Sequence, residues 1–378
     1  MTGLRLTVLA GRTVPRPLPP DATARLRQAV VTETDDARSA FTLTFDAGRT
    51  GPLAALDSPV VLEPPVPVNA RVCLVVTLGA VPHVLFDGIA TEATLTPGEG
   101  EGSATLQVTG QDVSLLLDRE ERDVEWPALD DHAQALAILG PYAAQGIVPL
   151  AIPPADADPP LPTDRVPTQH ETDLARLTAL AARHGYVTYT IPGPTPGTST
   201  LYWGPPVRTG VPQPALSVDL GPETNVLAPP KFRLDSLGPL TVEGSVQDPR
   251  TGSVTAVRST APLRPPLAAV PVWSTEAAAL RRKRYRESGP STTTALARAQ
   301  AEVHRSMDCV VGEGALDGSR YGSLLRPRGL VGVRGAGWSH DGLWYVRQVE
   351  HDLRPGSYRQ TFTIAREGYG STVPAVAV

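Results

Sequence analysis

Forty prolines and 34 glycines in 378 residues limit what this chain can fold into more than any other feature. Proline removes a backbone hydrogen-bond donor, and glycine supplies the positive φ angles that tight turns need. Such a composition argues against a helix-rich protein and favours many short strands joined by turns. The length allows two or three domains of about 100–200 residues each.

Charge and cysteine usage exclude several classes of protein. The formal charge is −5 with the two signs interspersed, which is unlike a nucleic-acid-binding domain. Cys73 and Cys309 lie far apart and outside any C-x-x-C pattern, so neither a zinc site nor a redox pair is expected. Cys73 lies in an apolar run and is predicted to be a small buried hydrophobe.

Targeting signals are absent from the sequence pattern. The apolar stretch near the N-terminus is too short for a signal peptide, and prolines follow it at once. No window approaches the ~20 apolar residues of a membrane-spanning helix. We therefore expect a protein that is made in the cytoplasm and does not insert into a membrane.

The first 120 residues are predicted to be β-rich. Strict alternation places Phe41, Leu43 and Phe45 on one face of a strand. The apolar run at 71–78 is typical of a strand that is covered on both faces. Strands at this spacing, with little helix between them, predict a small closed barrel or sandwich. The predicted strands cover residues 40–45, 71–78, 83–91 and 103–108.

A mixed region follows. Residues 131–139 are a candidate short helix, and 153–167 form a proline-rich connector. Thr168 and Glu171 fit the T-x-x-E capping box of a helix that Gly185 would end. An apolar stripe supports this helix, and two strands that could pair as a hairpin come after it, which together predict a small α/β unit. The stripe is Leu174, Leu177, Leu180 and Ala181, and the two strands are 186–189 and 200–203.

The remainder of the chain returns to strands, with one helix inserted. Residues 293–307 should form a helix with one apolar face, and 259–271 a proline-rich loop. The last predicted strand alternates, so its even-numbered residues share a face. The helix face is Leu296, Ala299, Val303 and Met307, and the strand face is Tyr358, Gln360, Phe362 and Ile364. The predicted strands cover 231–234, 240–245, 253–257, 329–333, 342–349 and 357–364.

These segments predict a mainly β fold with α+β insertions, built from two β-barrel domains around a small α/β domain. Two β-rich ends around a mixed centre suggest an old duplication. The expected division is 1–118 for the first barrel, 119–225 for the α/β domain with its connector, 226–258 and 308–368 for the second barrel, 259–307 for a proline-rich loop and helical insertion, and 369–378 for a tail.

Several segments, in this order, resemble the late control D family. The stretch from Phe86 to Ile89, then 103–112 and 114–119, is similar to that family's first barrel. Residues 169–189 are similar to its central helical segment. Residues 314–318, 325–329, 342–351 and 355–366 are similar to its second barrel. The family includes phage tail hub proteins and the hub part of VgrG, the spike protein of type VI secretion.

The resemblance implies a baseplate hub. In such hubs each subunit is similar to two tube-protein barrels in one chain, so that three subunits present six barrels to a hexameric inner tube above and a trimeric spike below. Only twelve residues follow Arg366, which implies a hub whose spike is a separate chain. The implied partners are two further copies of the chain, an inner tube protein, a trimeric spike and other baseplate proteins, with no nucleic acid.

Acidic and histidine residues offer possible catalytic arrangements. Glu120 with Glu121, and Asp130 with Asp131, are adjacent carboxylate pairs, but adjacent side chains usually diverge and stay solvated. A Ser-His-Asp arrangement could be drawn with His340 or His351, but no G-x-S-x-G motif accompanies them. The aspartates next to these histidines are Asp341 and Asp352. Turn residues and, for His351, a structural role are the preferred interpretations.

Two further motifs have ordinary interpretations. The basic cluster at residues 281–286 could contact phosphate, but a solvated face or an intersubunit salt-bridge patch is favoured. The glycines within 329–337 do not open a helix, and they fit bulges and turns better than a nucleotide loop. Thr172 with Asp173, and Asp317 with Gly318, read as a helix start and a turn.

The sequence therefore predicts a structural protein that is not an enzyme. No catalytic, cofactor-binding or metal-ligating residue is predicted, and no cofactor is expected. One alternative is a cell-wall or polysaccharide-acting hydrolase of a tail tip, which would need two carboxylates in a cleft. Another is a receptor-binding β-protein, although aromatic residues make up only 5% of the chain.

Overall fold

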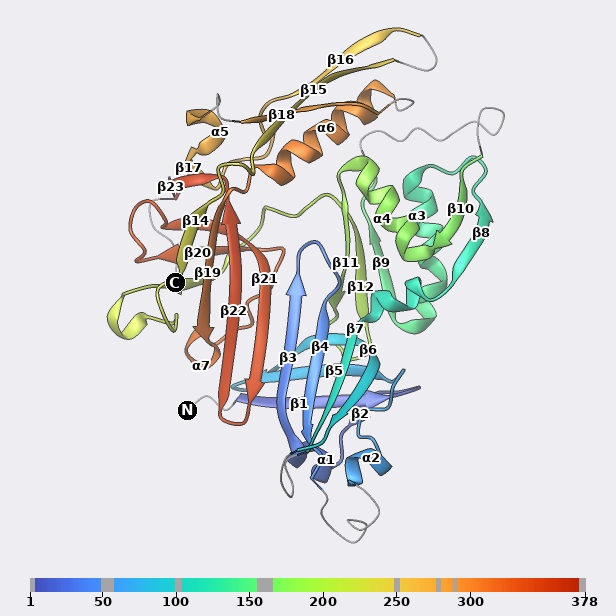
Figure 1. The fold of residues 1–378 in the computed structure, drawn as a ribbon, viewed down its shortest axis with the longest axis vertical. Helices are drawn as coiled ribbons and strands as arrows, with labels where there is room; N and C mark the ends of the chain where they lie inside the picture. Colours follow the sequence, from blue (N-terminus) through green and yellow to red (C-terminus); the bar gives the residue numbers. More distant parts are fainter. Residues whose placement is uncertain are drawn as a thin grey trace.

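The computed structural model describes residues 4–48, 58–98, 104–154, 166–247, 252–276, 280–287 and 291–373. The fold is mainly β, as predicted, and a single 13-stranded sheet runs through it. Upright strands of this sheet form a continuous wall across the middle of the molecule (Figure 1). The longer helices, α3, α4 and α6, lie above the wall and at its side, and the short helices α1 and α2 lie at its lower end.

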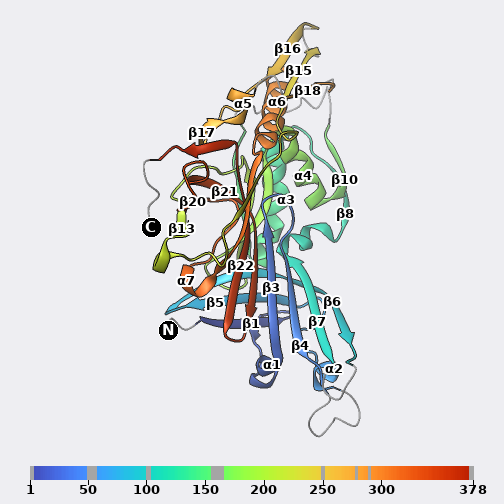
Figure 2. The ribbon, with the colours of Figure 1, turned by 60° about the vertical axis from the view of Figure 1, so that its left-hand side comes forward.

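The first six-stranded part of the sheet, here the first module, has the strand order β3-β4-β7-β6-β5-β1. Strands β1 and β5 cross the lower part of the upright strands as a second layer (Figure 2), and one apolar core lies between the two layers. Phe41, Leu43 and Phe45 all face that core, as their alternation predicted. The strands are β1 (Leu4–Gly11), β3 (Leu26–Thr34), β4 (Ala40–Asp46), β5 (Arg71–Leu78), β6 (Val81–Thr96) and β7 (Thr105–Asp112).

The second module has the strand order β14-β19-β22-β21-β20-β13. Taken in chain order, its six strands repeat the pairing of the first module strand by strand, from β1 with β13 to β7 with β22. One pairing differs in direction. Strand β13 lies parallel to β20, whereas the equivalent strands β1 and β5 are antiparallel. The strands are β13 (Gln213–Ser217), β14 (Lys231–Leu234), β19 (Val310–Asp317), β20 (Leu330–Arg334), β21 (Gly342–Arg354) and β22 (Ser357–Arg366).

Between the modules lies the α/β region, with an apolar core of its own. Its strands make a three-stranded sheet, β11-β12-β9, and a separate pair, β10-β8. Helix α4 begins at Thr172, whose side chain accepts a hydrogen bond from the Ala175 amide, and it ends at Gly185 in the left-handed conformation. The elements are η1 (Val113–Asp118), β8 (Glu121–Glu125), α3 (Asp131–Leu139), η2 (Gly140–Gln145), β9 (Ile147–Ala151), β10 (Thr168–Thr172), α4 (Asp173–His184), β11 (Val187–Pro192) and β12 (Ser199–Gly204).

A small lobe sits at the upper end of the wall. Strands β16-β15-β18 form its sheet, and helix α6 packs on it with a separate apolar core. The lobe is inserted between β14 and β19 of the second module. Its elements are β15 (Leu240–Gln247), β16 (Val254–Ser259), β17 (Ala268–Pro271), α5 (Val272–Thr275), β18 (Arg281–Arg284) and α6 (Thr292–Ser306). The remaining short elements are β2 (Arg16–Pro17), α1 (Pro20–Arg25), α2 (Pro59–Leu62), η3 (Gly221–Glu223), α7 (Gly318–Tyr321) and β23 (Gly368–Ser371).

Most predicted elements are present, and four details differ. Strand β13 belongs to the second module, although residues 119–225 were expected to form the α/β domain. The capping box at Thr168 and Glu171 is wrong, because both residues lie in β10 and pair with β8. Leu296 is 39% exposed, and Ala295 takes its place on the buried face of α6. Of the stretch 226–258, strand β14 joins the large sheet, whereas β15 and β16 turn away to cover α6, because their apolar side chains pack on that helix.

Candidate assembly surfaces

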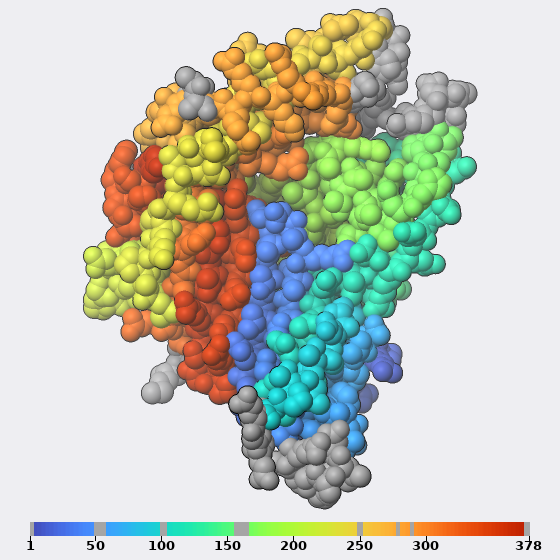
Figure 3. All heavy atoms as spheres, in the orientation of Figure 1, coloured from blue at the N-terminus to red at the C-terminus, as the bar shows by residue number. Residues whose placement is uncertain are grey.

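The two modules are joined edge to edge by strands β3 and β21. These strands form an antiparallel ladder of six consecutive residue pairs, from Gln348 opposite Thr34 to Leu353 opposite Ala29. Strand β21 accommodates this because its first residues pair with β20 and its later residues pair with β3. In Figure 3 the two modules meet along a closed seam at the centre of the molecule. The joint therefore continues the sheet from one module into the other.

A buried polar cluster lies behind this ladder. Glu33 on β3 forms an ion pair with Arg326, with the nitrogen and oxygen atoms 2.9 Å apart. The Nε2 atom of His351 on β21 lies 3.3 Å from the Glu33 carboxylate. Because the carboxylate can only accept, Nε2 carries the proton and Nδ1 accepts from the Tyr358 hydroxyl at 2.8 Å. Glu33 and His351 are 4% and 0% exposed, so the pairing satisfies groups that would be costly to bury alone.

Burial and charge act against each other at this cluster. Burial by itself would raise the pKa of the Glu33 carboxyl, but Arg326 and the hydrogen bond from His351 hold it below its ordinary value. Burial lowers the pKa of His351, against the opposing pull of Glu33. Arg326 also donates to the backbone oxygens of Val84 and Leu85 on β6. A side chain of the second module thus binds two strands of the first.

One face of the wall is polar and uncovered. Neighbouring strands place Thr109, Thr42, Val30, Asp352 and Arg359 in one row across β7, β4, β3, β21 and β22. All five side chains are exposed or half-buried, whereas the alternate residues of the same strands are buried. A second row runs beside it: Gln111, Ala40, Thr32, Glu350 and Thr361. The joint between the modules lies within this face and does not interrupt it.

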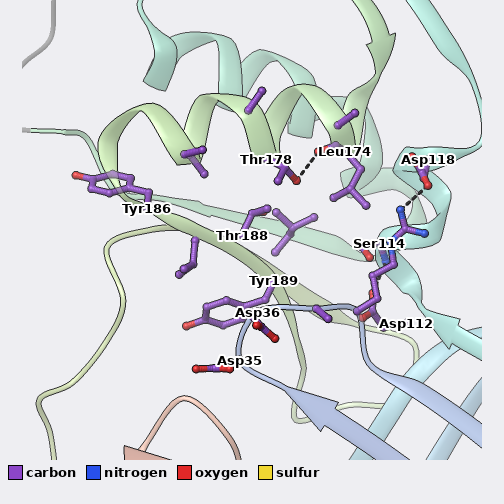
Figure 4. A pocket seen from close by; sticks show the side chains of 18 of the residues that line it. Asp35, Asp36, Asp112, Ser114, Asp118, Leu174, Thr178, Tyr186, Thr188 and Tyr189 are labelled. Carbon is purple, nitrogen blue, oxygen red and sulfur yellow. Dashed lines mark hydrogen bonds and ion pairs between the residues drawn. The ribbon is translucent and has the colours of Figure 1, made fainter. Parts of the chain in front are cut away.

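A groove of about 710 Å³ separates the β3–β4 hairpin from helix α4 (Figure 4). Asp35 and Asp36 lie at its hairpin side near Tyr189, and Leu174 and Thr178 of α4 line the opposite side. Burial, followed by the neighbouring Asp36, raises the pKa of Asp35 to about 6.

Two other carboxylates of this groove have structural partners. Asp112 accepts hydrogen bonds from the amides of Ser39 and Ser114. Asp118 pairs with Arg38 and also accepts from the Thr172 hydroxyl. Both acids therefore hold loops together, which leaves them poorly suited to proton transfer.

A second buried ion cluster fastens the lobe to the second module. Asp308, just before β19, has a fully buried side chain and binds Arg208 and Arg264. Arg347 of β21 lies 3.8 Å away. Burial would raise the pKa of Asp308, but these arginines hold it below its ordinary value.

The acidic pairs considered for catalysis lie apart in structural roles. Asp130 caps helix α3 by accepting from the Ala133 amide at 2.7 Å. Asp131 binds Arg183 at 3.1 Å and His184 at 2.9 Å. Glu120 and Glu121 are exposed at the start of β8. The structure thus does not bring these pairs into one cleft.

The histidines and the basic cluster are also separated. His340 stacks on Phe232 with ring centres 4.1 Å apart, and Asp341 accepts from the Ala336 amide in a turn. Four residues of the basic cluster form β18, whose side chains are exposed, and Lys283 pairs with Glu302 of α6.

Two kinds of feature do not occur in the described ranges. No group of three or more His, Cys, Asp or Glu side chains there is placed to hold a metal ion. No helix among the described residues has the length and apolar character to cross a bilayer. Cys73 and Cys309 are buried free thiols, as expected for Cys73.

The sequence analysis missed the residues that join the modules. Glu33 follows Ala29 and Val31 at alternate positions, so a charged residue stands on the apolar face of a strand. That signal could have identified a buried ion pair. Its partner Arg326 is 293 residues away and could not be found from local pattern.

Comparisons with known proteins identify the fold as that of phage tail proteins. No family model and no curated protein matches the chain. A tail protein from Neisseria meningitidis is similar over 97% of both chains, with a TM-score of 0.63 and 13% identity. The 43 kDa tail protein of prophage MuSo2 from Shewanella oneidensis matches over 96% of this chain and 98% of its own, with a TM-score of 0.63 and 17% identity.

A type VI secretion protein has a similar fold. The E. coli c3393 protein is described as a component of that system with structural similarity to the phage T4 tail proteins gp27 and gp5. It matches 97% of this chain and 79% of its own length, with a TM-score of 0.55 and 13% identity. The fold expected from the late control D resemblance is thereby confirmed.

Proposed function

We propose that this protein is a structural subunit of the baseplate hub in a phage-tail-like contractile injection system. Three copies form a ring that joins the hexameric inner tube to a separate trimeric spike. The observation that carries the proposal is the fusion of two modules of equal strand order into one wall. A chain with two such modules lets a threefold ring meet a sixfold tube, because three copies present six modules.

The uncovered face of the wall suits the lining of a ring. Its rows carry mostly threonine, glutamine and scattered charges of both signs, so a passing cargo meets no apolar patch and no single-sign field. The buried ion pair behind the joint favours a rigid wall, since both modules share it. The protein is proposed to be an assembly component and not an enzyme, and no cofactor is assigned to it.

The oligomeric state of the purified chain tests this proposal. We expect light scattering at micromolar concentration to give three times the monomer mass, and electron microscopy to show rings with quasi-sixfold density. Separately purified inner tube and spike proteins should bind opposite faces of that ring. A strictly monomeric particle that does not respond to either partner would overturn the proposal. Hydrolysis of cell-wall polymers by the chain would contradict its non-enzymatic part.

A further inference from the structure

We propose that strand β14 of one copy pairs with the second half of β6 in the next copy, repeating between subunits the joint that β3 and β21 make within the chain. This inference rests on the proposed ring and identifies the strands that would close it. Its starting point is the equal strand order of the two modules, in which β14 corresponds to β3 and β6 corresponds to β21.

The two long strands share an uncommon construction. Strand β21 pairs with β20 through its first residues, passes an irregularity at Arg347, and then offers the same side to β3. Strand β6 pairs with β5 through its first half and passes an irregularity at Thr91, at the corresponding distance from the turn that follows. Beyond Thr91, however, the side that corresponds to β3 has no partner strand among the described residues.

Strand β14 is open in the complementary way. It pairs with β19 on one side, and within the described part of the chain its other side pairs with nothing. In the wall order β14-β19-β22-β21-β3-β4-β7-β6, these two open sides are the two ends. The joint is head-to-tail, which is the kind of contact that closes rings.

The internal joint fixes the register of the proposed one. Equivalent positions in the two modules can be traced through the residue pairs of neighbouring strands. In this way Phe232 of β14 is equivalent to Val31 of β3, and Leu95 of β6 is equivalent to His351 of β21. Six pairs carried across in this way place Arg233 opposite Thr94 and Leu234 opposite Ala93. A shift by a single residue would turn every side chain to the wrong face of the sheet.

The side chains on the two open edges fit this register. Leu95 and Leu234 are 41% and 38% exposed, and they occupy the positions of His351 and Glu33, which are buried at the internal joint. The joint would therefore bury two exposed leucines on the core side of the wall, and the removal of their apolar surface from water favours association. On the polar side, Glu92 of one copy lies diagonal to Arg233 of the next, so opposite charges meet.

Disulfide crosslinking tests the register directly. We expect at least one of two cysteine pairs to link copies under mild oxidation: Thr94→Cys with Arg233→Cys, or Ala93→Cys with Leu234→Cys. Two pairs are tested because neighbouring residue pairs of an antiparallel ladder alternate between wide and narrow spacing. The product on non-reducing gels should end at three linked copies. The matched control is Thr94→Cys with Lys231→Cys, whose backbones would be about 8 Å apart and too distant to bridge.

The outcomes separate this inference from the proposed function. A trimer by light scattering in which neither designed pair crosslinks overturns the strand pairing and leaves the hub intact. Open chains of variable length that crosslink at the designed pair keep the joint and overturn the threefold ring. A monomer that never crosslinks overturns both.

A second pair of variants tests the buried leucines. Leu95→Glu and Leu234→Glu should each weaken the trimer at least tenfold, since a carboxylate would be buried at the joint. Leu263→Glu changes a leucine that is 82% exposed and lies on neither of the two edge strands, so it should leave the trimer unchanged. Equal effects of all three substitutions would contradict the proposed interface.

Discussion

The two modules share one strand order but differ in the length of one connection between equivalent strands. In the first module, β3 and β4 are joined by a short hairpin of residues 35–39. In the second module, the equivalent strands β14 and β19 are separated by residues 235–309, whose described part forms the lobe. The Asp235 amide bonds to the Cys309 carbonyl at 2.8 Å, so the insertion leaves and returns at one point. Two modules of one strand order can therefore differ by an insertion at one end of the wall without disturbance of its faces.

Breaking the joint between the modules should have the largest effect. Arg326→Ala leaves the Glu33 carboxylate buried without its cation, and we expect the free energy of unfolding to fall by about 3–5 kcal/mol. Chemical denaturation would measure this. Arg359→Ala, on the exposed face of β22, is the control and should cost less than about 0.5 kcal/mol. A loss below about 1 kcal/mol for Arg326→Ala would mean that the cluster does not hold the modules together.

Removing the charge that fastens the long insertion should cost less. Asp308→Asn keeps the shape of the side chain but leaves Arg208 and Arg264 facing a neutral group, so we expect a loss of about 2–3 kcal/mol. Limited proteolysis should also cut the lobe sooner than the wall. If the lobe and the wall instead became sensitive together, the lobe would not be a separately loosened unit.

The lobe touches the α/β region, and a glycine permits that contact. Gly185 ends α4 with a φ of +67°, and a Cβ atom there would lie 2.0 Å from the Cβ of Ala301 in α6. Gly185→Ala should cost about 2–3 kcal/mol from backbone strain and the clash together. Gly197 has a φ of +84° with open space around it, so Gly197→Ala should show the strain alone, about 1 kcal/mol. Equal unfolding midpoints for the two variants would mean that α4 and α6 lie farther apart than in this structure.

The short hairpin should show the smallest effect, and it depends on pH. Because the pKa of Asp35 is raised to about 6 in the folded state, the folded protein holds its proton more tightly than the unfolded chain does. The free energy of unfolding therefore falls as pH rises, and the stability that protonated Asp35 contributes is lost between about pH 4 and pH 6.

Asp35→Asn should remove this loss. Between pH 4 and 7 we expect wild-type stability to decline by about 1–2 kcal/mol relative to Asp35→Asn, measured by denaturation at each pH. Asp36→Asn relieves only the neighbouring charge, so it should remove a smaller part. Identical pH curves for wild type and Asp35→Asn would show that the Asp35 carboxyl is not shifted.

Local pattern predicted most of the elements but not their arrangement. Strands β5 and β14 and helix α3 have the predicted bounds, because alternation, apolar runs and turn residues act within a few positions. The capping box was predicted one turn too early, at Thr168, whereas Thr172 with Asp173, which the sequence also indicated as a helix start, does begin α4. Pairing with β8, which is distant in sequence, draws Thr168 into a strand.

The joint could not be predicted, because nothing near β3 specifies β21 as its neighbour. Strand β3 itself was not among the predicted strands, and any other strand of the described residues could have offered an edge. The choice depends on the bulge that re-aims β21 and on the pairing of Glu33 with Arg326 across the chain. The candidate assembly surfaces thus follow from tertiary structure, although the charged residue among apolar ones on β3 pointed to them.

The direction of the β3–β21 ladder has a mechanical consequence. Its hydrogen bonds run across the strands, so a force applied along the strands loads all six residue pairs at once in shear. A force across the strands would instead open the pairs one after another, like a zip. A wall built this way resists a force along its strands better than a force across them, which suits the proposed hub role.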